Sequence, residues 1–98
     1  MSPQQSIDRS KPKILMYSTG MCSYCARAEA LLRNKGAVSI EKLRVDLDPG
    51  WREEMIARTG ERTVPQIYIG DRHIGGCDEL YALDRAGRLN ALLAGTDA

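Results

Sequence analysis

The cysteines are the residues of this chain whose type and spacing could do chemistry. The 98 residues contain three of them, and Cys22 and Cys25 form a Cys-x-x-Cys pair around Ser23 and Tyr24. Two thiols at this spacing can cycle between dithiol and disulfide, or supply half of a metal site. An odd cysteine count behind a polar N-terminus without an apolar signal segment argues against a secreted disulfide framework. We therefore expect a reducing compartment, the cytoplasm.

The position of the pair along the chain assigns different roles to its two thiols. It lies between a short apolar run at residues 14–17 and a helix predicted over residues 23–35. Cys22 then stands at the helix N-terminus, where free backbone N–H groups and the helix dipole favour a thiolate. Cys25 lies one turn further and faces inward. Cys22 is thus the predicted nucleophile, and Cys25 the predicted resolving thiol.

Other chemistry of a Cys-x-x-Cys pair has less support in the sequence. A structural zinc site needs a second pair of ligands, and only Cys77 and His73 remain for it. Haem attachment needs a histidine directly after the second cysteine, where Ala26 stands. An inert structural disulfide is disfavoured in a reducing compartment.

The elements that must position the pair read as strand, helix, strand, helix, two strands and a last helix. Apolar patterning places strands near residues 14–17, 38–45, 65–69 and 72–74. The last two strands should form a hairpin, and the residues of the third should alternate in burial. Helices are expected over residues 23–35 and 49–60, and from a cap at Asp78 through Leu93. We predict an α/β fold: a mixed four-stranded sheet, its first two strands parallel and its last two antiparallel, flanked by about three to four helices.

Composition limits the remaining classes of function. Fourteen basic and 13 acidic residues give a net charge of +1, and 43% of the residues are hydrophobic. Such a balance is ordinary for one soluble domain and does not indicate binding to nucleic acid. No apolar run approaches the roughly 18 residues of a membrane helix. We expect residues 1–12 to be a disordered polar tail and residues 13–98 to be the folded domain.

Three segments carry a resemblance to a known family. They are Cys22-Ser23-Tyr24-Cys25 followed by Arg27-Ala28, Arg62-Thr63-Val64-Pro65-Gln66-Ile67, and Gly75-Gly76-Cys77-Asp78. With them the chain resembles the small bacterial dithiol glutaredoxins over about four-fifths of its length. The resemblance implies a thioredoxin-like fold and a monomer without a tightly bound cofactor. It also implies glutathione as co-substrate, and glutathionylated or disulfide-containing proteins as substrates.

The resemblance also implies a glutathione site. Thr63, Val64 and Pro65 would form a turn with a cis proline, in which the Val64 backbone pairs with the cysteine of glutathione. An ordinary trans proline at the start of a strand is the alternative for Pro65. Tyr24 would border the site. Arg52 would pair with the glycyl carboxylate, or would simply be a solvated helix charge.

The last segment would hold the other end of glutathione. Backbone N–H groups of Gly76 and Cys77 would bind the γ-glutamyl carboxylate at a helix N-terminus, and Asp78 would bind the neighbouring ammonium. Asp78 could also be a helix cap. The Cys77 side chain could be a third redox thiol, or a small buried group, which we favour.

Two departures from the family pattern affect the expected activity. Many members carry a lysine shortly before the motif, where this chain has Thr19 and Gly20. We therefore expect the helix end, with Arg52, to stabilise the thiolate, and either weaker glutathione binding or a less acidic Cys22. Ser23 resembles members that hold a [2Fe–2S] cluster between two subunits, with Cys22 of each subunit and two glutathiones as ligands. A cluster carrier, dimeric only in that state, is the alternative function.

Overall fold

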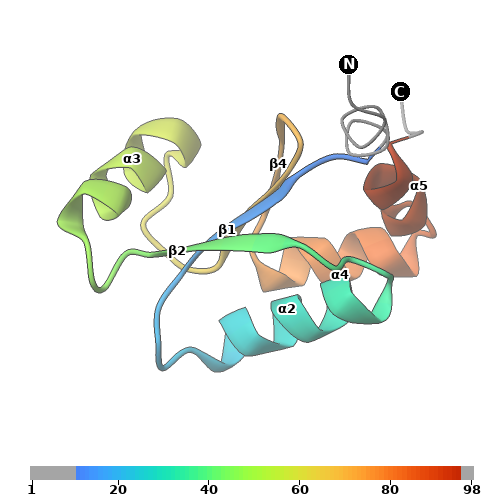
Figure 1. Ribbon diagram of the computed structural model, residues 1–98, viewed down its shortest axis with the longest axis horizontal. Helices are drawn as coiled ribbons and strands as arrows, with labels where there is room; N and C mark the ends of the chain where they lie inside the picture. Colours follow the sequence, from blue (N-terminus) through green and yellow to red (C-terminus); the bar gives the residue numbers. More distant parts are fainter. Residues whose placement is uncertain (1–10, 96–98) are drawn as a thin grey trace, which may run out of the picture.

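The computed structural model describes residues 11–95 and confirms the predicted α/β architecture (Figure 1). Its elements are β1 (Ile14–Ser18), α2 (Ser23–Asn34), β2 (Ile40–Arg44), α3 (Pro49–Thr59), β3 (Gln66–Ile69), β4 (Arg72–Gly75), α4 (Cys77–Arg85) and α5 (Leu89–Ala94). The strand order is β2-β1-β3-β4. As predicted, β1 is parallel to β2, and β3 and β4 are antiparallel; β1 and β3 are also antiparallel.

Both faces of the sheet are covered, which explains why the central strands are so apolar. Ile14 and Met16 of β1 point to the face packed by α2, α4 and α5. Tyr17 of β1 points to the other face, where Met55 of α3 packs against it. The short run of apolar residues in β1 therefore serves two cores at once, as expected for a strand buried on both sides.

Helix α2 buries the predicted stripe of Cys25, Ala28, Leu31 and Leu32. These positions recur at helical spacing, so they line one face and pack on the sheet. The helix ends before Gly36, whose φ of 101° is accessible to glycine at little cost. Because α2 begins directly after Cys22, packing of this stripe fixes the orientation of the cysteine pair.

Helix α3 lies on the opposite face and is attached to the sheet by a buried tyrosine. The Tyr17 hydroxyl donates to Glu54 Oε2 at 2.6 Å and accepts from Arg58 Nη1 at 2.9 Å. As predicted, α3 begins with Asp48 as its cap, and that side chain accepts from the Gly50 amide at 2.8 Å. These contacts place the first turn of α3, which carries Arg52.

Three details of the predicted elements are wrong. The residues of β3 do not alternate in burial, since β3 lies between β1 and β4 and all four are buried. The last helix is two helices, because the chain turns at Gly87, where φ is 75°. The second strand begins only at Ile40, and Val38 before it is 88% exposed.

The predicted tail at residues 1–12 falls mostly outside the described residues, so its disorder and the domain boundary stay predictions. Among residues 11–95, none of the helices has the length and apolar character needed to cross a bilayer.

Candidate active site

Cys22 occupies the N-cap position of α2, as the sequence predicts. Its backbone is extended, with φ −135° and ψ 108°, and its Sγ accepts a hydrogen bond from the Cys25 amide at 3.1 Å. The sulfur thereby satisfies one of the free N–H groups at the helix start. A negative charge on this sulfur would face the positive end of the helix dipole, so the position suits a thiolate.

Cys25 is the inward partner, and the residue is only 5% exposed. Burial raises the pKa of the Cys25 thiol to about 12, and a hydrogen bond with Cys22 acts in the same direction. A hydrogen bond from the Thr19 backbone opposes this rise. Since Cys22 is partly exposed, it is the thiol that an external disulfide meets first. This asymmetry matches the predicted division into nucleophile and resolving thiol.

The predicted turn at Pro65 lies against the start of α4. The Val64–Pro65 peptide bond is cis, as the resemblance implies. A Cβ atom on Gly76 would lie 3.2 Å from the Pro65 carbonyl oxygen, closer than a side-chain carbon comfortably packs. The missing side chain at Gly76 therefore lets the N-terminus of α4 approach the turn. Val64 and Pro65 are brought together with Gly76 and Cys77.

Cys77 begins α4 and is buried, with 5% of the residue exposed. Burial raises the pKa of the Cys77 thiol, and the charge of Arg27 partly offsets this rise. Its packing in the main apolar core fits the favoured interpretation of a small buried side chain.

Asp78 does not cap α4, contrary to one of its two predicted roles. The N-cap is Gly76, and Glu79 reaches back so that its Oε1 accepts from the Gly76 amide at 2.8 Å. The capping group is the third residue of the helix, a frequent arrangement when the N-cap has no side chain of its own to contribute. Asp78 is exposed in the first turn of α4, so its carboxylate is accessible to a ligand.

The remaining predicted residues surround this centre. Tyr24 is 54% exposed, and the Arg27 guanidinium lies 5.8 Å from its ring centroid. Arg52 is exposed on α3 and forms no ion pair with the described residues, so it is available to an anion. Thr63 is bound through its carbonyl, which accepts from Gln66 Nε2 at 3.0 Å.

One contact beside the cysteines was not predicted from the sequence. The Gly20 amide donates to Asp46 Oδ2 at 3.2 Å, and Arg44 pairs with the same carboxylate at 2.7 Å. Arg44 and Asp46 are two positions apart at the end of a predicted strand, and this spacing indicates that their side chains lie on the same face of the strand. Only the strand register, which pairs Ser18 with Arg44, shows that this side faces the loop before Cys22.

The zinc alternative finds no support in the geometry. Residues 11–95 contain no cluster of three or more His, Cys, Asp or Glu side chains placed to hold a metal ion. His73 instead shares a 2.8 Å hydrogen bond with Gln66 and packs against the Tyr68 ring, with centroids 5.1 Å apart.

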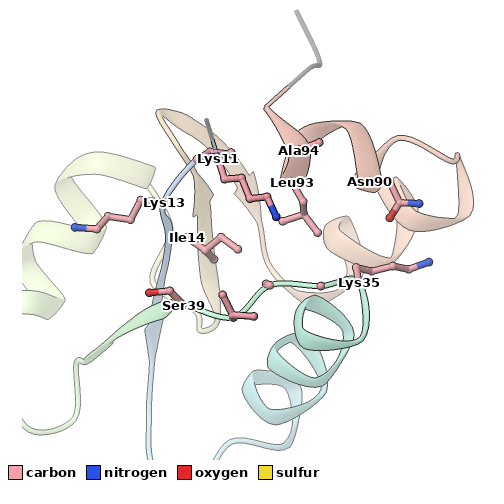
Figure 2. A pocket seen from close by; sticks show the side chains of 12 residues that line it. Lys11, Lys13, Ile14, Lys35, Ser39, Asn90, Leu93 and Ala94 are labelled. Atoms are coloured by element: carbon pink, nitrogen blue, oxygen red, sulfur yellow. The ribbon is translucent and has the colours of Figure 1, made fainter. Parts of the chain in front are cut away.

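A separate hollow of about 740 Å³ lies at the other end of α2 (Figure 2). It is lined by both ends of the described chain, from Lys11 to Ile14 and at Leu93 and Ala94, together with Lys35. None of the predicted site residues lines it, so it is not part of the cysteine site.

A thioredoxin-like fold with a Cys-x-x-Cys pair at the start of the helix after β1 defines a thiol–disulfide oxidoreductase. The family model for glutaredoxin matches residues 14–74. The chain therefore belongs to the glutaredoxin family.

Individual relatives agree with this assignment. The chain is 55% identical over 78 residues to glutaredoxin 3 of Escherichia coli K12, which covers 80% of this chain and 93% of the relative. The solution structure of a Brucella melitensis glutaredoxin has a TM-score of 0.78 at 44% identity, covering 91% of this chain and 96% of that one. The crystal structure of a buckwheat glutaredoxin–glutathione complex has a TM-score of 0.77 at 30% identity, covering 97% and 91%.

Proposed function

We propose that this protein is a glutathione-dependent oxidoreductase that reduces glutathione mixed disulfides and protein disulfides. The observation that carries the proposal is the partly exposed Cys22 sulfur at the start of α2, beside a buried second thiol. The reaction uses reduced glutathione, which a reducing cytoplasm supplies. One chain contains every residue that the proposal uses, so we propose a monomer.

The first step is attack by Cys22 on a mixed disulfide. The Cys22 thiolate bonds to the sulfur of the glutathione half, the original disulfide breaks, and the substrate thiol leaves and takes up a proton. The thiolate of a second glutathione then attacks the sulfur of the bound glutathione, and the bond from that sulfur to Cys22 Sγ breaks. Glutathione disulfide forms and the Cys22 thiolate returns. The oxidant is the substrate disulfide. Reduction of one protein disulfide oxidises two added glutathiones, and reduction of one glutathione mixed disulfide oxidises one.

The cis-proline turn and the start of α4 are the proposed glutathione site. The Val64 backbone would pair with the cysteine of glutathione, next to Thr63 and Pro65. Backbone N–H groups of Gly76 and Cys77 would bind the γ-glutamyl carboxylate at the start of a nine-residue helix. Support comes from the close approach of Gly76 to Pro65, and from the similarity to a glutaredoxin solved as a glutathione complex.

Exposed side chains complete the proposed site. Asp78 would pair with the γ-glutamyl ammonium, and Arg52 with the glycyl carboxylate. Tyr24 would border the bound peptide. The exposure of all three supports these roles, since each can reach a ligand without rearrangement of the core.

Cys25 would serve the reduction of protein disulfides. When Cys22 holds a protein in a mixed disulfide, the Cys25 thiolate attacks Cys22 Sγ. The intramolecular disulfide forms and the protein thiol leaves. Glutathione then reduces the Cys22–Cys25 disulfide.

Glutathione-coupled reduction of a small glutathione mixed disulfide tests the proposal. We expect turnover by the wild type, loss of turnover in Cys22→Ser, and retained turnover in Cys25→Ser. A wild type without turnover would contradict the proposed reaction. A Cys25→Ser variant without turnover would contradict only the step in which glutathione itself releases Cys22.

The cluster carrier is the second proposed function, and Ser23 is the feature that favours it. Ser23 keeps a backbone N–H that proline at this position would lack. Cys22 would be this chain's ligand, with the remaining ligands from two glutathiones and a second copy. Anaerobic reconstitution with iron, sulfide and glutathione should then give visible absorbance and a dimer. Colourless monomer would exclude this function.

A further inference from the structure

Three residues form a contact against the loop before Cys22 that the proposed reaction does not use. The Gly20 amide donates to Asp46 Oδ2 at 3.2 Å. Arg44 Nε and Nη2 donate to Asp46 Oδ1 and Oδ2 at 2.8 and 2.7 Å. This two-pronged pairing is the strong geometry for an arginine and a carboxylate. We call Gly20, Arg44 and Asp46 the loop clamp.

The backbone around β2 holds the clamp in place. The Val45 amide donates to the Ser18 carbonyl at 2.9 Å, which extends the β1–β2 pairing beyond the strand end. The Arg44 carbonyl then accepts from the Leu47 and Asp48 amides, each at 3.2 Å. Asp46 is thus fixed in a tight turn directly beside the loop that follows β1.

Gly20 lies in close contact with the Arg44 side chain. A Cβ atom there would lie 2.4 Å from Arg44 Nη2 and 2.9 Å from Arg44 Cζ. The guanidinium therefore occupies the space that a side chain at position 20 would need. Gly20 does not have a positive φ, so alanine would suit the backbone and would only displace the end of the Arg44 side chain.

The clamp also brings a cation to a loop that lacks the lysine expected from the family pattern. Thr19 and Gly20 are uncharged, and Arg44 reaches the loop from the neighbouring strand. The Arg44 guanidinium holds the pKa of the Asp46 carboxyl well below its usual range, and the Gly20 amide contributes to this. The carboxylate is therefore charged at neutral pH, where it accepts from Gly20 and Arg44.

The clamped loop touches the resolving thiol. A hydrogen bond from the Thr19 backbone reaches the Cys25 sulfur, and Thr19 directly precedes Gly20. Only Met21 separates Gly20 from Cys22, whose Sγ accepts from the Cys25 amide. A shift of the Gly20 amide would therefore move the group that contacts Cys25.

We propose that Gly20, Arg44 and Asp46 are positioning residues for the attack of Cys25 on Cys22. The proposal rests on the proposed function. In that step the Cys25 thiolate bonds to Cys22 Sγ and the bond from Cys22 to glutathione breaks. Glutathione leaves as a thiolate and takes up the proton that Cys25 released. Attack by external glutathione does not involve Cys25, so the clamp acts on the intramolecular step alone.

The rate at which glutathione leaves Cys22 tests the proposal. The protein is first loaded with oxidised glutathione, and the release is then followed by rapid quenching and mass spectrometry. We expect Asp46→Ala and Gly20→Ala to slow the intramolecular release about tenfold, the scale of one hydrogen bond to a charged group. Asp46→Asn keeps an acceptor oxygen for Gly20, so it should restore part of the rate. Lys42→Ala is the matched control, because it removes another exposed ion pair of β2, with Glu29 at 3.1 Å. It should release glutathione at the wild-type rate.

Two further measurements separate positioning from general damage. Hydrogen exchange at the Gly20 amide should accelerate in Asp46→Ala and stay unchanged in Lys42→Ala, whether or not the protein reacts with glutathione. In a Cys25→Ser background, the clamp substitutions should leave release by added glutathione unchanged.

The possible results also distinguish the two proposals. Wild-type release rates in both Asp46→Ala and Gly20→Ala, together with faster Gly20 exchange in Asp46→Ala, would overturn the positioning role. Equal slowing in the Cys25→Ser background would overturn its restriction to the intramolecular step. A wild type that takes up no glutathione on Cys22 would overturn the proposed function, and the role in resolution with it.

Discussion

The Cys25 amide donates a hydrogen bond to Cys22 Sγ at 3.1 Å, so the proposed nucleophile is also the cap of α2. Substitution at Cys22 should therefore separate chemistry from stability. Serine is a good helix cap and alanine is not, a difference of about 1 kcal/mol.

We expect Cys22→Ser and Cys22→Ala to be equally inactive on a glutathione mixed disulfide. Only the alanine variant should lose stability, by about 1 kcal/mol in urea unfolding of the reduced proteins. Equal stability of the two variants would show that the Cys22 side chain does not cap the helix.

The raised pKa of Cys25 predicts a pH dependence of the intramolecular step. Burial raises this pKa to about 12. At neutral pH the thiolate is then scarce, and its amount rises with pH. Release of glutathione from Cys22 should accelerate through pH 9, whereas attack by external glutathione should level off near the pKa of a free thiol, about 8.5. Stopped-flow rates from pH 6 to 10 check this, and a plateau of the intramolecular rate below pH 9 contradicts it.

Asp78 gives a test of glutathione recognition. If its carboxylate pairs with the γ-glutamyl ammonium, Asp78→Asn should raise KM for a glutathione mixed disulfide about tenfold and leave kcat nearly unchanged. Asp71→Asn is a suitable control, since Asp71 is exposed in the turn between β3 and β4. Steady-state kinetics with equal KM values for the two variants would remove Asp78 from the site.

Cys77 can be tested for a redox role by its side chain alone, because its proposed contribution to binding is a backbone amide. We expect Cys77→Ala and Cys77→Ser to retain turnover of the mixed disulfide. Cys77→Ser should be the less stable, by about 1–2 kcal/mol, because it places a hydroxyl in the main apolar core. A large loss of turnover in both variants would instead indicate a third reactive thiol.

Elements with a strong local signal were predictable from the sequence. The two-sided burial of β1, the apolar stripe of α2 and the Asp48 cap of α3 each follow from neighbouring residues. The full burial of β3 was not predictable in this way, because it depends on which strands lie on either side. The break between α4 and α5 was missed because the leucines on both sides of Gly87 read as one apolar face.

The candidate site shows the same division between local and distant information. The position of Cys22 at a helix start follows from the order of strand, motif and helix. The contact of Gly20 with Asp46 joins residues 26 positions apart, so it depends on the register of β1 and β2. Likewise, the choice of Glu79 over Asp78 as the capping group depends on where the first turn of α4 begins.

Both ends of the described chain meet at the hollow in Figure 2, where Lys11 and Ala94 share a wall with Lys35 at the far end of α2. Cys22 stands at the opposite end of that helix, and 12 residues of helix, about 18 Å, separate the two places. A fluorescent probe or a surface linker attached at the side chain of Lys11 or Lys35 would therefore start well away from the reactive sulfur. The far end of α2 is thus a place where the domain can be labelled or immobilised while its thiols stay open to substrates.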